Sequence, residues 1–218
     1  MNKWLYWIKT GLLNILYVAM AAIFFGIFQS LINDELTPMN IASTGLYYAL
    51  PLSSLIICLL NIRKTTSMVN MVVSMGETRK NTILGINIMN LTSVFTAVAA
   101  IALLSILSGG ELIDLYTAFV PMPAIYLVAV GCGICINSLK CENTSTLTAL
   151  QSVLMACSMA LLFGLHGMLG IFMNDSRINI DADIRLTVII FSAACGILLC
   201  IIGNIRMRKR IMSMEVCL

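Results

Sequence analysis

The chain has 218 residues, of which 60% are hydrophobic and only 11% are charged, and its formal net charge is +3 at pH 7. A soluble domain carries about 25% charged residues, and a mean hydropathy of +0.97 is too high for a surface that meets water. The composition therefore excludes a soluble globular protein and predicts an all-α, polytopic integral membrane protein.

The chain begins with "MNKWLYWIK", in which Trp4, Tyr6 and Trp7 stand between two lysines. Aromatic and basic residues in this mixture are typical of a helix lying at the membrane surface, so an interfacial helix is predicted over residues 1–9. The apolar run that follows is too long for the hydrophobic part of a signal peptide. We expect it to be retained as the first span.

Apolar runs of the ~20 residues that a bilayer requires predict six membrane-spanning helices within one transmembrane domain, 1–218. None of them contains Asp, Glu, Lys or Arg, and a charge at mid-bilayer costs at least ~2.5 kcal/mol. The predicted spans lie at about 10–32, 41–61, 83–107, 117–138, 147–172 and 186–205.

The basic residues orient these spans. Of the 13 lysines and arginines, all except Arg177 and Arg185 fall on one side if the N-terminus is cytoplasmic. Since lysine and arginine are enriched in cytoplasmic loops, we expect both termini inside the cell.

The connection between the second and third spans, residues 62–82, contains the clearest amphipathic pattern in the chain. A helix over about 67–77 would place methionines and Val72 on one face and polar side chains on the other. Gly76 suits the C-terminal end of that helix, and Thr78 is expected to cap the next one. The polar stripe consists of Ser67, Asn70, Ser74 and Glu77. Periodicity alone equally allows a plain interfacial anchor.

Polar residues inside the spans are the candidates for a substrate path. In the third span these are Asn87, Asn90 and Thr96, and in the fifth it is His166, which we expect near the outer surface. Such groups more often hold helices together than line a path. Three glycines flank the histidine, so a break or re-entry of the helix is a further hypothesis.

The eight cysteines lie in spans or on the cytoplasmic side, which argues against extracellular disulfides. Cys132 and Cys135 have the spacing of a redox or metal pair, but cysteine in an apolar helix is usually a packing residue. The chain has no P-loop, no His-Glu-x-x-His and no Gly-x-Ser-x-Gly motif. Together with the absence of ionisable groups at mid-bilayer, this argues against an intramembrane enzyme.

Six spans with both ends inside, and an amphipathic helix between spans two and three, resemble the permease subunit of an ABC-2-type transporter. Small bacterial members carry a segment like Ser-x-Gly-x-Thr-Arg-Lys at that place, which stands here as Ser74, Gly76, Thr78, Arg79 and Lys80. The architecture matches over essentially the whole chain, and the motif covers about seven residues.

The resemblance implies that 67–77 is a coupling helix, which docks into a separate ATP-binding cassette subunit through the polar stripe and residues 76–80. ATP and Mg would be bound by that partner, and this chain would be non-catalytic with no cofactor or metal of its own. The implied partners are the ATPase, a second copy or a paralogous six-span permease, and membrane lipid, but no nucleic acid. The implied setting is the bacterial plasma membrane, with export of peptide, bacteriocin-like or hydrophobic substrates. The alternative is a membrane-embedded sensor or immunity protein that binds a peptide or lipid without transporting it.

Single-cysteine labelling tests the orientation. In a cysteine-free background, we expect cysteines at positions 34 and 177 to react with an impermeant maleimide from outside. Cysteines at 64 and 209 should react only after the membrane is permeabilised. Labelling of position 64 in intact cells would contradict the predicted topology.

Overall fold

The computed structural model describes residues 3–32, 51–62, 78–107, 120–139, 144–168 and 182–213, with seven single residues between them, at 37, 38, 41, 44, 45, 49 and 72. These residues form helices and turns, and none of them lies in a strand, as the all-α prediction requires. The helices are α1 (Lys3–Ile32), α3 (Arg79–Leu107), α5 (Met122–Asn137), α6 (Thr144–Met168) and α7 (Ala182–Ser213), with a shorter helix at Pro51–Ile62.

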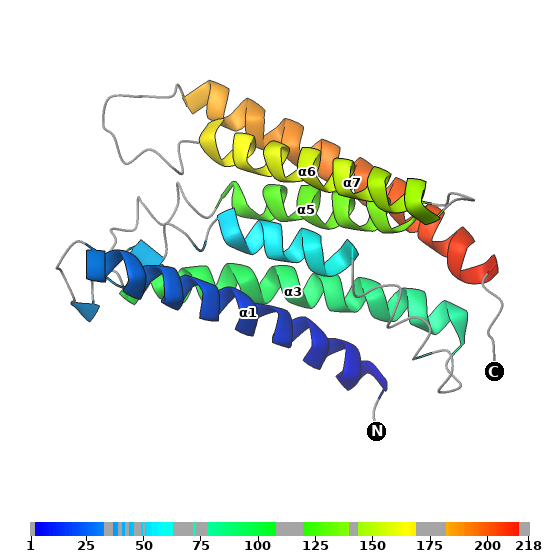
Figure 1. Cartoon of the computed structure of the whole chain (residues 1–218), viewed down its shortest axis with the longest axis horizontal. Helices are drawn as coiled ribbons and strands as arrows, with labels where there is room; N and C mark the ends of the chain where they lie inside the picture. Colours follow the sequence, from blue (N-terminus) through cyan, green and yellow to red (C-terminus); the bar gives the residue numbers. More distant parts are fainter. Residues whose placement is uncertain are drawn as a thin grey trace.

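The helices lie roughly side by side and alternate in direction along the chain (Figure 1). As a result, α1 begins, α3 begins and α7 ends at the same end of the bundle. We call this the basic end, because it carries Arg79, Lys80, Arg206, Arg208, Lys209 and Arg210.

Four of the helices are long and apolar enough to cross a membrane: Trp4–Ile32, Arg79–Leu103, Ser145–Met168 and Asp183–Ser213. They correspond to the first, third, fifth and sixth predicted spans. The helices within the second and fourth predicted spans, Pro51–Ile62 and Met122–Asn137, are shorter than a span. Parts of those two predicted spans lie outside the described residues, so the total of six stays a prediction.

The surface of these helices is apolar, as contact with lipid requires. Phe24, Phe95 and Phe191 are each more than 60% exposed, on α1, α3 and α7 respectively. Exposed phenylalanines on three helices are unfavourable in water but natural in hydrocarbon. The described part of the chain is therefore built for a membrane rather than for water.

The N-terminal segment differs from its prediction. Residues 3–32 form one uninterrupted helix of 30 residues, so no separate interfacial helix is set off over the described residues 3–9. The physical reason is that Trp7 is only 3% exposed and packs against α3. A Cβ at Gly85 of α3 would come within 2.2 Å of the indole, so the glycine makes room for the ring.

The helix α5 lies at the centre of the bundle. Of its 16 residues, those buried are Met122, Ala124, Ile125, Tyr126, Val128, Ala129, Val130, Gly131, Gly133, Ile134, Ile136 and Asn137. Pro121 precedes the helix and Pro123 lies in its first turn, where the missing amide hydrogens of proline cost nothing. The two prolines thus mark the start of α5.

Small residues allow α5 and α7 to approach closely. A Cβ at Gly196 would lie 2.8 Å from the backbone nitrogen of Val128, and one at Gly131 would lie 3.1 Å from the nitrogen of Cys200. Because lipid supplies no hydrophobic drive for helix association, such close backbone contact is a main source of stability between membrane helices.

Two thiol hydrogen bonds reinforce the same contact. Cys135 donates to the carbonyl of Leu199 at 3.3 Å, and Cys200 donates to the carbonyl of Leu127 at 3.4 Å. Cys132 and Cys135 are both free thiols. This arrangement favours the packing role for the Cys-x-x-Cys pair.

A single added methyl group tests this contact. We expect Gly196→Ala to lower the stability of the detergent-solubilised protein by ~1–3 kcal/mol, the usual cost of overpacking. The measurement is the midpoint of heat-induced loss of the monodisperse peak on size exclusion. Gly164→Ala is the matched control, because its Cβ would meet nothing within 4 Å. Equal midpoints for the two variants would contradict the close packing of α5 on α7.

Candidate functional site at the basic end of the bundle

The predicted coupling helix falls largely outside the described residues. Ser67, Asn70, Ser74, Gly76 and Glu77 are not described. The one described residue of 67–77 is Val72, which is helical and 5% exposed. The amphipathic helix over 67–77 and the orientation of its two faces therefore stay predictions.

The predicted cap of the third span is confirmed. The side-chain oxygen of Thr78 accepts a hydrogen bond from the backbone N–H of Asn81 at 3.3 Å, and the Thr78 carbonyl accepts one from Thr82 at 3.0 Å. Thr78 thus satisfies an amide that the first turn of a helix leaves without a partner. The helix starts at Arg79 and continues without a break to Leu107.

The first residue of α3 is tied to the last turns of α7. The guanidinium of Arg79 donates a hydrogen bond to the backbone carbonyl of Met212. Carbonyls in the last turn of a helix lack intrahelical partners, and a cation there is favourable with respect to the helix dipole. The adjacent Lys80 is exposed, so the two basic residues of the predicted motif have different surroundings.

A second polar cluster joins the ends of three helices. Arg210 of α7 donates to the backbone carbonyl of Asn137 and lies 3.3 Å from its side-chain oxygen. The amide nitrogen of Asn137 donates in turn to the carbonyl of Asn61 at 3.3 Å. Hydrogen bonds to a charged donor are about twice as strong as neutral ones. This cluster therefore fixes the ends of α5, α7 and the Pro51–Ile62 helix against one another.

This cluster was not predicted from the sequence. Arg210 counted there only as a cytoplasmic charge, and Asn61 and Asn137 had no predicted role. Each asparagine lies near the end of an apolar run, where a side chain can satisfy open carbonyls. That position was the available signal, but the pairing of residues 73 and 76 positions apart depends on the tertiary packing.

The candidate path residues in α3 do not share one environment. Asn87 is half-buried, whereas Asn90 is 5% exposed and its amide has no hydrogen-bond partner among the described residues. Thr96 is half-buried, and its hydroxyl donates to the carbonyl of Thr92 one turn earlier. Back-bonding of this kind satisfies a hydroxyl within its own helix, so Thr96 behaves as a structural residue.

His166 lies apart from these residues. It belongs to α6, which packs mainly on α5, whereas α3 packs mainly on α1. The histidine is fully buried, and its Nδ1 lies 2.7 Å from the carbonyl of Leu162. From the sequence we expected His166 near the outer surface of the membrane, in contact with water. In the structure the surrounding side chains enclose the imidazole ring.

The helix α6 has no break beside His166 up to Met168, the last described residue of this segment. Both Gly164 and Gly167 lie within a continuous helix. In hydrocarbon, backbone groups have no water to bond with, so an apolar helix tolerates glycine.

Two further buried contacts hold the Pro51–Ile62 helix in place. The hydroxyls of Ser53 and Tyr126 are 2.6 Å apart, and the Cys58 sulfur lies 3.8 Å from the hydroxyl of Ser158. The first contact connects the helix to α5 and the second connects it to α6. They explain how a helix of this length is anchored within the bundle.

Among the described residues, no group of three or more His, Cys, Asp or Glu side chains could hold a metal ion. The basic end offers guanidinium donors and capped helix ends, which suit contact with another protein. Comparison with protein-family models, with curated proteins and with solved structures gives no match for this chain.

Removing one guanidinium tests the cluster. We expect Arg210→Gln to accelerate amide hydrogen exchange over the last turns of α7 by roughly ten- to hundredfold, since a hydrogen bond to a charged group contributes ~1.5–3 kcal/mol. Arg208→Gln is the matched control, because Arg208 is exposed on the same helix two residues earlier. Identical exchange in both variants would contradict the role of Arg210.

Proposed function

We propose that this chain is the membrane-spanning permease subunit of an ATP-driven ABC transporter of the ABC-2 type. The observation that carries the proposal is the start of α3. A capped helix begins directly after the amphipathic segment, runs on as a candidate membrane span, and is tied through Arg79 to the end of α7. A force applied to the loop before Thr78 would therefore reach the membrane-spanning part of the chain directly.

The proposed mechanism is mechanical. ATP binding draws two ATPase subunits together, and each carries a docked coupling helix with it. The helix α3 has 29 residues, which corresponds to about 44 Å at ~1.5 Å per residue. A helix of that length can act as a lever, and its displacement tilts the span as a rigid body.

The hydrogen bonds at the basic end would pass this motion from α3 to α7 and α5. Arg79 connects α3 to α7, and Arg210 connects α7 to α5. The close packing of α5 on α7 makes these two helices move together. We expect α3, α5 and α7 to rock as a unit, in line with the two-state rearrangements of packed helices.

The remaining parts of the transporter are supplied by other chains. ATP and Mg would be bound by the ATPase subunit, and six spans would form half of a translocation path. A second copy or a paralogous chain would complete the path in the plasma membrane of a bacterium. The apolar composition suits export of peptide, bacteriocin-like or hydrophobic substrates.

Charge reversal at Glu77 tests the docking. Glu77 lies in the polar stripe that is proposed to face the ATPase. In cells that make both subunits, we expect Glu77→Lys to insert normally but to lose ATPase association and transport, because a like charge in a desolvated contact costs several kcal/mol. A plain interfacial anchor would be unharmed, since added positive charge near anionic lipid is favourable.

Glu142→Lys is the control, because it makes the same charge change in the other predicted cytoplasmic loop. We expect it to retain ATPase association. The readouts are co-purification of the ATPase and vesicle ATPase activity. Full association and activity in Glu77→Lys would contradict the docking role and favour the anchor.

A further inference from the structure

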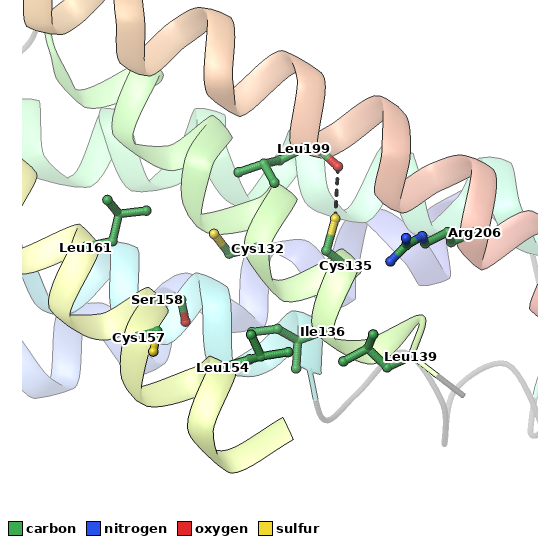
Figure 2. A pocket seen from close by; sticks show the side chains of 10 residues that line it. All are labelled: Cys132, Cys135, Ile136, Leu139, Leu154, Cys157, Ser158, Leu161, Leu199 and Arg206. Carbon is green, nitrogen blue, oxygen red and sulfur yellow. Dashed lines mark hydrogen bonds between the residues drawn. The ribbon is translucent and has the colours of Figure 1, made fainter. Parts of the chain in front are cut away.

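Two adjoining hollows lie between α6 and α7, with α5 as their floor. They arise because α6 and α7 both pack on α5 but barely contact each other. Their volumes are about 330 and 340 Å³, and both are lined by Leu161 of α6 and Leu199 of α7. Together they form a groove along the bundle, which we call the α6–α7 groove. Figure 2 shows the hollow nearer the basic end.

The groove is apolar along its length and charged at one end. Its lining extends along α7 from Phe191 and Ser192 to Arg206, which belongs to the basic end. Figure 2 shows the Arg206 side chain extending from α7 toward Cys135 at the edge of the hollow. Among the described residues the only acidic one is Asp183, at the opposite end of α7. Arg206 therefore has no described carboxylate near it.

The dimensions of the groove fit an acyl chain. From Phe191 to Arg206 the helix rises roughly 22 Å at ~1.5 Å per residue, and one leaflet of a bilayer supplies roughly 15 Å of hydrocarbon. A helix ~10 Å across occupies on the order of 1,700 Å³ over the same length. The two hollows, at about 330 and 340 Å³, are small beside that figure and favour a narrower occupant such as an acyl chain.

We propose that the α6–α7 groove binds an anionic glycerophospholipid. One acyl chain lies along Leu161 and Leu199, and the headgroup phosphate contacts the Arg206 guanidinium at the basic end. Arginine recognises phosphate through paired N–H donors, and each basic residue near a membrane surface favours anionic lipid. The proposal goes beyond the transport function and does not depend on an ATPase.

Lipid titration of the full-length protein in mild detergent, followed by native mass spectrometry, tests the site. The probes are dioleoyl phosphatidylglycerol, which is anionic, and dioleoyl phosphatidylcholine, which is zwitterionic. We expect the first phosphatidylglycerol to bind the unmodified protein about fivefold more tightly than phosphatidylcholine, in keeping with one added cation contact. Arg206→Gln should abolish this preference while leaving phosphatidylcholine binding unchanged.

Two further variants distinguish the contribution of the headgroup contact from that of the acyl-chain contact. Arg208→Gln removes an exposed charge that does not line the groove, and we expect it to keep the preference. Leu161→Trp fills the groove, and we expect it to weaken the binding of both lipids to the same extent. If Arg206→Gln and Arg208→Gln weaken phosphatidylglycerol binding equally, the site is overturned. The preference would then come from the general positive charge of the basic end. Unchanged lipid binding in Leu161→Trp would also overturn the site. So would a second protein chain that occupies the groove and prevents both lipids from binding.

Discussion

The close contact between α5 and α7 organises the part of the bundle that includes α6 and the Pro51–Ile62 helix. Helices in hydrocarbon gain nothing by hiding apolar surface from lipid, so they associate through close packing and hydrogen bonds. Gly131 and Gly196 permit that approach, and Cys135 and Cys200 then reach the carbonyls of the opposite helix. A buried α5 in turn provides the surface on which α6 and the Pro51–Ile62 helix are held.

The basic end builds on that packing. Because α5 and α7 are held together, Arg210 can bond to Asn137, and Asn137 can reach Asn61. The Arg79 contact then adds α3 to the same group. A helix end that is capped and tied in this way transmits displacement instead of absorbing it. This property supports the proposed coupling role.

Local patterns in the sequence predicted the features that depend on neighbouring residues. The apolar runs predicted six spans, and four helices of spanning length correspond to four of them. Thr78 was recognised as the cap of α3 because capping needs only the next three residues. Features set by distant partners were missed. The N-terminal aromatic residues indicated an interfacial helix, but Gly85 accommodates Trp7 and the helix continues. Likewise, neither the burial of His166 nor the role of Arg210 can be read from nearby residues.

In the proposed function this chain forms one half of a membrane path driven by a separate ATPase. The most direct test is the native mass of the complex purified from its own cells, in mild detergent with lipid, through a C-terminal tag. We expect two six-span chains together with two ATP-binding subunits. A lone chain without an ATPase, under conditions in which the protein stays folded, would contradict it.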